Sequence, residues 1–345
     1  MAVLPTASVA GARLTIEQSL APIDPAAVAA KVDPHDEDEG SVIRDAGVVA
    51  VAAGEGAVTW AVRTVRGSFG LWVWTDGQAR MVATLPEDRE EYAGPPELEI
   101  GRTPSGFVVA VMGSWNGSYG VRLVRVDDGS TVPFPRRIGG RTLRHAAIDG
   151  GRVYVARNVV NRRKQVPRGR ASLWRASIDG LTVGRLSRVR SSTRSESWGP
   201  IAADRGRVAV LAGRDVRDPE WPSVSGAESW LVGSPRGRWR SAGLALISDY
   251  GYIPVRVVGF TRDRRNLVMV QNDDLDPSPA DVTRGPLRRG APRRRVTVET
   301  PLLADETVIA YDGSRDRLVV VGPDASGTTV VGLAKPRWGR MPRTS

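Results

Sequence analysis

The chain of 345 residues contains no cysteine and almost no histidine. Without cysteine it can form no disulfide bond, no thiolate metal site and no cysteine nucleophile. Its two histidines, His35 and His145, are far apart, and neither is spaced with a second metal ligand or with a serine and an acid. A zinc centre and a Ser-His-Asp triad are therefore not expected. We expect His145 to be a buried or channel-facing histidine with one hydrogen-bond partner.

Three sequence signatures of catalysis or nucleotide binding are also missing. The chain has no G-x-S-x-G nucleophile elbow, no P-loop and no complete G-x-G-x-x-G fingerprint. The sequence thus assigns no catalytic residue, no cofactor and no metal, and we interpret the chain as a non-catalytic protein. The alternative is an enzyme, a hydrolase or lyase acting on carbohydrate or peptide, whose carboxylates and arginines converge from distant strands.

Lysine is scarce too, since only Lys31, Lys164 and Lys335 occur, yet the net charge is +11 because arginine is abundant. A basic chain favours an anionic partner. The arginines are spread through every segment and alternate with acids, which also fits a compositional bias towards arginine codons. Aromatic residues are not interleaved with them, so nucleic acid is not the favoured partner. No apolar run approaches the roughly 18 residues that cross a bilayer, so no membrane span is predicted.

The first 44 residues lack the regularity of the rest. Residues 1–12, "MAVLPTASVAGA", end in the small-x-small pattern of a signal-peptidase site, without a basic region before it. We interpret 1–12 as a signal-peptide remnant and expect export to the periplasm, the cell envelope or the medium. A cytoplasmic protein with an alanine-rich N-terminus is the alternative. Residues 13–44 are expected to supply a closing strand, a short helix and an acidic linker.

From about residue 45, apolar segments recur every 45 to 60 residues or so, the length of one four-stranded β-propeller blade. Each is preceded by another short strand that ends in a turn. A third strand follows most of them, such as "GLWVWTDG" at 70–77 and "SLWRASIDG" at 172–180. The acid-glycine ending is typical of a hairpin turn into a fourth strand. The recurring segments, taken as second strands, are 57–62, 107–112, 152–157, 207–212, 266–271 and 317–322.

These units predict an all-β protein, a β-propeller of six four-stranded blades over 45–334, with seven blades as the alternative. In the fifth unit the third strand is placed at 294–302, and residues 335–345 are left as a C-terminal tail. The sixth unit lacks a fourth strand, and an open sheet edge invites aggregation. We therefore predict that 13–18 closes the ring by pairing beside 328–333.

The turn between first and second strands resembles the repeat of TolB-type and related WD-repeat-like bacterial propellers. In "FTRDRRNLVMV" at 260–270, Asp263 lies where the turn aspartate of that repeat belongs, and Leu267 and Val268 begin the second strand. The proline of the repeat is missing, and Arg264 replaces its glycine. The resemblance implies the propeller fold, and a fold alone does not give a function.

Three predicted connections between second and third strands are long, at 158–170, 214–228 and 272–294. We expect them to lie together on one face as a cap, because binding residues concentrate on loops held by a rigid scaffold. The mixed charge, with Trp221 as an aromatic anchor, favours a protein or an anionic envelope polymer as partner. The sequence indicates no oligomeric state. The candidate binding residues are Arg162, Arg163, Lys164, Arg168, Arg170, Trp221, Asp273, Asp274, Arg288, Arg289, Arg293 and Arg294.

Six tryptophans lie on predicted strands. We expect them to pack between blades rather than to form a platform for sugars, because aromatic rings bury large areas in cores. They are Trp60, Trp72, Trp74, Trp174, Trp230 and Trp239.

Overall fold

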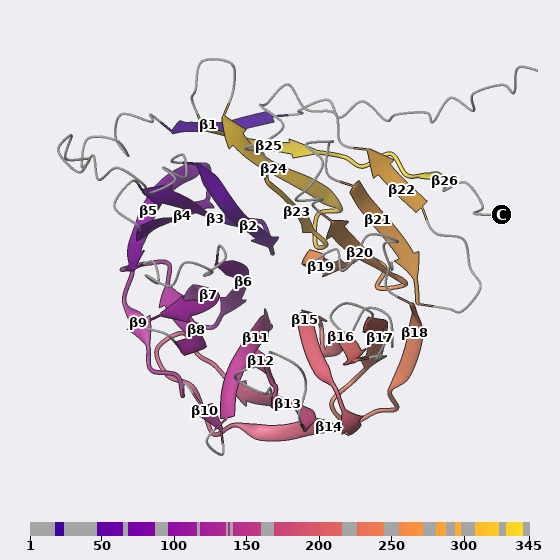
Figure 1. The fold of residues 1–345 in the computed structure, drawn as a ribbon. Coiled ribbons are helices and arrows are strands. Elements are labelled where there is room, and N and C mark those ends of the chain that lie inside the picture. Colours follow the sequence, from indigo (N-terminus) through magenta and orange to yellow (C-terminus); the bar gives the residue numbers. More distant parts are fainter. Residues whose placement is uncertain are drawn as a thin grey trace, which may run out of the picture.

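The computed structural model is a closed ring of six β-sheets around a central axis (Figure 1). All strand pairs are antiparallel, and no helix occurs among the described residues. The predicted six-bladed, all-β propeller is therefore confirmed. The structure describes residues 18–23, 47–64, 68–86, 96–115, 118–135, 137–138, 141–159, 169–215, 226–244, 255–271, 281–287, 294–297, 308–323 and 329–340.

Each blade has one strand at the axis, and the strands that pair after it lie successively further out (Figure 1); in blade three a two-residue strand precedes the axial one. Blades one to three comprise β2 (Val48–Gly54), β3 (Ala57–Thr64), β4 (Ser68–Thr75) and β5 (Gln78–Pro86); β6 (Glu97–Thr103), β7 (Gly106–Trp115), β8 (Ser118–Arg125) and β9 (Thr131–Val132); and β10 (Arg137–Ile138), β11 (Arg141–Asp149), β12 (Arg152–Arg157), β13 (Arg170–Ser177) and β14 (Ser187–Ser195). Blades four to six comprise β15 (Ser197–Asp204), β16 (Arg207–Asp215), β17 (Gly226–Gly233) and β18 (Arg240–Leu244); β19 (Val255–Phe260), β20 (Asn266–Gln271), β21 (Asp281–Pro286), β22 (Arg294–Thr297) and β26 (Gly339–Arg340); and β23 (Val308–Asp312), β24 (Arg317–Pro323), β25 (Thr329–Ala334) and β1 (Gln18–Ile23).

The predicted second strands are all present because each lies between two other strands of its sheet and between two neighbouring blades. A strand covered on both faces reads as a continuous apolar run rather than an alternating one. In β7 the residues Val108, Val109, Ala110 and Val111 are all fully buried. The regular runs in the sequence thus mark the central strands of the blades.

The hydrophobic core is divided among the spaces between blades. Each described core cluster combines residues of two neighbouring blades. Trp60 and Trp74 pack with Val319 and Val331 of blade six, and Trp230 packs with Phe260 of blade five. Trp72, Trp174 and Trp239 pack at the margins of such clusters. The expectation that the tryptophans pack between blades is confirmed.

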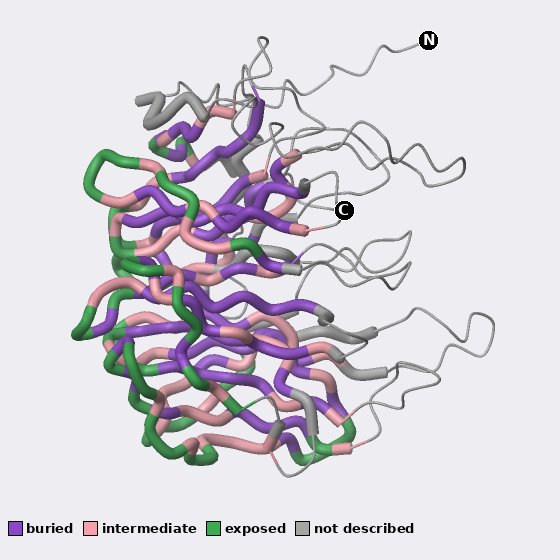
Figure 2. Tube along the Cα trace, turned by 90° about the vertical axis from the view of Figure 1, so that its left-hand side faces the viewer, coloured by how far each residue is buried: buried purple, intermediate pink, exposed green. Residues whose placement is uncertain are grey.

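Tight turns join the first strand to the second and, in blade one, the third to the fourth. Positive φ angles occur at both central residues of Glu55–Gly56, Asp76–Gly77 and Arg205–Gly206. This geometry is that of two-residue hairpin turns whose twist matches the strands. The face that carries these turns is called the hairpin face, and the opposite face the loop face. Figure 2 shows the exposed turns along one face of the ring, with the buried strands behind them.

A strand from the start of the chain closes blade six, as predicted. It is β1, which pairs antiparallel with β25 from Gln18↔Leu333 to Ile23↔Thr329. The strand lies at 18–23 rather than at 13–18. Near the other end of the chain, β26 pairs with β22 and makes blade five a five-stranded sheet. Residues 335–340 are therefore not a free tail.

Two strand assignments from the sequence were wrong. In blade five the third strand is β21, inside the range taken as one loop, and residues 294–297 form the fourth strand, β22. In blade three the acid-glycine ending at 172–180 does not lead directly into the fourth strand, because β14 begins only at Ser187. The carboxylate of Asp179 there accepts hydrogen bonds from the backbone N–H of Leu181 and of Thr182, at 2.8 and 2.7 Å. This Asx-type turn lengthens the hairpin before the chain pairs again.

Among the described residues, no helix is long and apolar enough to cross a membrane. Residues 1–17 and 24–46 lie outside the described part of the chain. The signal-peptide remnant, the short helix and the acidic linker therefore stay predictions.

Candidate functional site

The end of the central channel at the hairpin face is lined by carboxylates. All six innermost strands or their turns contribute to a cavity of about 80 Å³. The cavity is narrow because glycines let neighbouring inner strands approach closely. A Cβ atom on Gly101 would lie 2.6 Å from Cγ2 of Ile148, and one on Gly54 would lie 2.7 Å from the carbonyl oxygen of Ile100. The acidic lining residues are Glu55, Glu99, Asp149, Asp204 and Asp312.

Three of these carboxylates hold neighbouring blades together. Each accepts a hydrogen bond from a backbone N–H in the next blade, where the chain turns from the first strand to the second or enters that turn. Hydrogen bonds to an ionised acceptor are among the stronger ones in proteins. These acids therefore act as ties between blades. The bonds are Arg102 N to Glu55 Oε2 at 2.6 Å, Gly56 N to Asp312 Oδ2 at 3.1 Å, Arg205 N to Asp149 Oδ1 at 2.8 Å and Gly206 N to Asp149 Oδ2 at 2.7 Å.

Replacing Asp149 by alanine is expected to lower the free energy of unfolding by about 2–3 kcal/mol, because two partly buried N–H groups lose a charged acceptor. Asp149→Asn keeps one acceptor oxygen and should cost roughly half as much. Chemical denaturation of both variants measures the difference. Equal stability of Asp149→Ala and the parent chain would contradict a tie between blades three and four.

Glu99 differs from the three ties. In the described part of the chain, no group donates a hydrogen bond to its carboxylate, and burial raises its pKa well above the ordinary value of 4.5. Burial also raises the pKa of Asp204, although Arg205 and Arg264 lie 3.7 and 4.0 Å from its oxygens and oppose the shift. Burial thus raises the pKa of three carboxyl groups in this lining, Glu99, Asp204 and Glu55, and the shift is large only for Glu99.

The pH dependence of stability should report on Glu99. The folded chain holds this proton more tightly than the unfolded chain, so stability is lost as pH rises from 4.5 through the folded-state pKa. The glutamine side chain of Glu99→Gln cannot ionise. The melting temperature of this variant minus that of the parent chain should therefore increase as pH rises. A difference between the two chains that does not change with pH would contradict this account.

Asp179→Asn is a control with the opposite sign. The backbone N–H groups of Thr182 and Leu181 lower the pKa of Asp179. Its stabilising effect is therefore present above the ordinary pKa and is lost as pH falls. The disadvantage of this variant relative to the parent chain should disappear in acid.

His145 lies in β11 towards the loop face, where its Nδ1 is 2.9 Å from Oε2 of Glu97. Its side chain is 14% exposed, so the expectation of a buried or channel-facing histidine with one partner is confirmed. Glu97 also accepts a hydrogen bond from the hydroxyl of Tyr119, whose pKa is raised by burial and by Glu97. Within the described ranges, no group of three histidine, aspartate or glutamate side chains is placed to hold a metal ion.

The structure describes two of the candidate binding residues and separates them. Arg170 is exposed at the start of β13, at the loop face, whereas Arg294 begins β22, at the hairpin face. These two candidates therefore do not share one face, because β21 divides the range 272–294. The other candidates lie outside the described residues: Arg162, Arg163, Lys164, Arg168, Trp221, Asp273, Asp274, Arg288, Arg289 and Arg293.

No protein-family model and no curated protein matches this sequence. Solved structures with a similar fold include a triple arginine-to-alanine mutant of AofleA from Arthrobotrys oligospora, at 9% identity and a TM-score of 0.49, covering 86% of this chain and 87% of that one. A TolB-like protein from Agrobacterium tumefaciens is 14% identical, with a TM-score of 0.38 and coverage of 55% and 62%. The acylaminoacyl peptidase of Pyrococcus horikoshii is 9% identical, with a TM-score of 0.44 and coverage of 86% and 53%.

These likenesses concern the fold alone. The six-bladed ring itself agrees with the propeller fold that the resemblance to TolB-type repeats implies. The chain spans 53% of the length of the P. horikoshii peptidase and 27% of the tricorn protease, which has a TM-score of 0.45.

Proposed function

We propose that this chain is a non-catalytic propeller that binds a negatively charged partner, an anionic envelope polymer or an acidic protein. The observation that carries the proposal is the separation of charge. The described channel lining at the hairpin face contains five carboxylates and no basic residue, whereas the whole chain carries +11. The surplus of arginine therefore lies outside this end of the channel. An outer surface of this kind attracts polyanions.

The ties at the channel support a binding role over chemistry. Glu55, Asp149 and Asp312 have their oxygens engaged by backbone N–H groups, so they are poorly suited to exchange protons with a substrate. The partner surface in this proposal is the loop face, with Arg162, Arg163 and neighbouring basic residues as contacts. Export to the periplasm, the cell envelope or the medium belongs to the same proposal.

The test is binding of the full chain to dextran sulfate and to poly-glutamate, with neutral dextran as the blank. Arg162→Ala/Arg163→Ala is compared with Arg238→Ala/Arg262→Ala, which removes the same charge from the hairpin face. We expect the first pair to weaken binding about tenfold or more, with a steep dependence on salt concentration. No binding to either anionic polymer, or equal binding by both variants, would overturn the proposal.

One observation favours a second function, catalysis by proton transfer in the channel. Glu99 lines the cavity and is kept towards its protonated form, which is the state that a general acid requires. The test is turnover of a panel of aryl glycosides and peptide anilides by the parent chain and by Glu99→Gln. Turnover by the parent chain that disappears in the variant supports catalysis by Glu99. The same rate in both chains would show that Glu99 takes no part in the reaction.

A further inference from the structure

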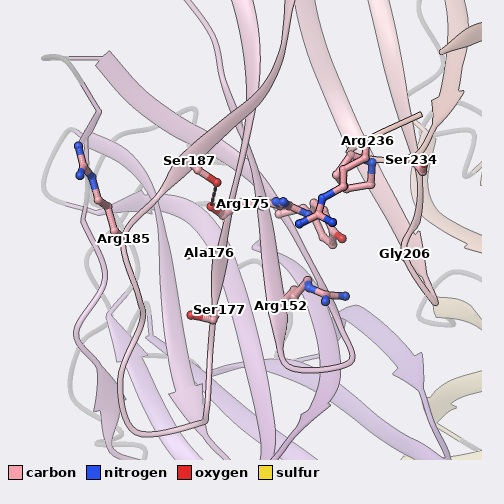
Figure 3. A pocket seen from close by; sticks show the side chains of 11 residues that line it. Arg152, Arg175, Ala176, Ser177, Arg185, Ser187, Gly206, Ser234 and Arg236 are labelled. Carbon is pink, nitrogen blue, oxygen red and sulfur yellow. Dashed lines mark hydrogen bonds between the residues drawn. The ribbon is translucent and has the colours of Figure 1, made fainter. Parts of the chain in front are cut away.

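A second concave site lies at the hairpin face between blades three and four. It is a groove of about 450 Å³, formed by β12, β13 and the β13–β14 turn of blade three and by the two turns of blade four. Figure 3 shows Arg152, Arg175 and Arg236 on one side, and Arg185 apart from them with its guanidinium pointing away. The lining residues, here called the arginine groove, are Arg152, Tyr154, Arg175, Ala176, Ser177, Arg185, Ser187, Gly206, Ser234, Pro235 and Arg236.

The charge of the arginine groove is all of one sign. Four guanidinium groups line it, and no described lining residue is acidic. Within the part of the chain that the structure describes, no ion pair involves these four arginines. A concave surface with four unpaired positive charges attracts anions and raises their local concentration.

The arginines of the groove also differ from others in the chain. Seven described arginines lie over an aromatic ring, with the guanidinium carbon 5.2 to 6.0 Å from the ring centroid. None of those seven lines the groove. Packing therefore accounts for many arginines of this basic chain, but it does not account for the four in the groove.

Tyr154 adds a hydrogen-bond donor to this wall. Its side chain is fully buried; the guanidinium of Arg175 lies near enough to interact with the phenol oxygen, but no described acceptor receives the proton of the hydroxyl. Burial raises the pKa of this phenol, although Arg152 and Arg175 oppose the shift, so the hydroxyl keeps its proton. A buried donor without a partner is costly unless a ligand satisfies it.

The remaining lining selects for a polar ligand. Ser177, Ser187 and Ser234 supply hydroxyl groups, and only Ala176 and Pro235 are apolar and small. The ring of Tyr154 is not exposed for stacking a base. A guanidinium group can donate two parallel hydrogen bonds to two phosphate oxygens. The positive charges of several guanidinium groups are best neutralised by a ligand with groups that carry more than one negative charge. The volume exceeds what one phosphate group fills.

We propose that the arginine groove binds a small ligand that carries two or more phosphate groups, held by Arg152, Arg175 and Arg236 with the Tyr154 hydroxyl as a further donor and Arg185 at the margin of the groove. This site is on the opposite face from the loops of the proposed function. It does not depend on that function, although both involve anions.

Calorimetric titration of the full chain with tripolyphosphate tests the proposal, with inorganic phosphate and citrate as comparison ligands. We expect tripolyphosphate to bind more tightly than either. Arg175→Ala/Arg236→Ala should lose about 100-fold in affinity, roughly tenfold for each guanidinium removed. Arg175→Lys/Arg236→Lys keeps the charge but not the forks and should fall in between. Tyr154→Phe should lose about three- to tenfold.

Arg238→Ala/Arg262→Ala is the control, because both arginines are exposed at the hairpin face outside the groove. Melting without ligand shows whether each variant folds. If the groove variants and the control variant bind tripolyphosphate with equal affinity, the proposed site is wrong. If the parent chain binds citrate as tightly as tripolyphosphate, the assignment of the ligand to phosphate is wrong. Loss of tripolyphosphate binding in Arg162→Ala/Arg163→Ala alone would place the anion on the loop face. Polymer binding by the loop face is measured separately, so either proposal can fail without the other.

Discussion

Replacing Trp60 by alanine should lower the free energy of unfolding by about 3–5 kcal/mol, the range for removing a large aromatic side chain from a core. Trp60 is fully buried and stacks on Trp72, with ring centroids 6.2 Å apart and an interplanar angle of 11°. It also packs against Val319 and Val331 of blade six. The substitution would open a cavity where the first blade meets the last.

Two variants sharpen this measurement by chemical denaturation. Trp60→Phe keeps most of the ring, and the indole N–H that it removes has no partner in the described structure, so it should cost far less. Leu181→Ala is the surface control, because Leu181 is 51% exposed and its loss should change stability by less than about 0.5 kcal/mol. A loss below about 1 kcal/mol for Trp60→Ala would mean that blades one and six are not packed as described.

Removing β1 should be at least as damaging. A chain that starts at residue 24 lacks the strand that pairs with β25, and each lost ladder hydrogen bond contributes roughly 0.5–1.5 kcal/mol. The outer edge of β25 would then be open to pairing between molecules. We expect a loss of about 3 kcal/mol or more, together with concentration-dependent aggregation.

A synthetic peptide of residues 16–25 should restore the truncated chain. The peptide can add to the open edge of β25 as an extra strand, a known mode of peptide recognition. Thermal melting and light scattering with and without the peptide measure the recovery, and a peptide with the same residues in scrambled order is the control. A truncated chain as stable as the parent chain would show that β1 does not close the ring.

The sequence predicted the central strands of the blades well and some outer strands poorly, for one physical reason. Central strands such as β7 are buried on both faces and need apolar residues throughout. The outer strand β14 is largely exposed, and its sequence "SRVRSSTRS" carries no apolar run. In β21, "DVTRGP" resembles a loop because of Gly285 and Pro286, yet Val282 and Thr283 are buried. Contacts with other strands override local preference there.

The sites could not be predicted because their residues come from different blades. Asp312 and Gly56 are 256 residues apart in the sequence, and nothing local to either predicts their hydrogen bond. The arginine groove joins Arg152 and Arg175 of blade three to Arg236 of blade four. One signal was present, because arginine begins the second strand at Arg152, Arg207 and Arg317, always beside the hairpin face. The recurring position of arginine in the repeats thus indicated basic residues along the hairpin face, but it did not indicate where two blades form a groove.

The pairing of β1 with β25 also constrains the order in which the protein can fold. Gln18 is synthesised early and its partner Leu333 late, so blade six remains incomplete until nearly all the other blades exist. Such distant pairings slow folding, because the chain loses entropy before the contact stabilises it. During synthesis, β1 is a strand without its sheet. Blades one to four and the first four strands of blade five lie between β1 and β25 in the sequence, so they can form while ring closure remains the last and slowest step.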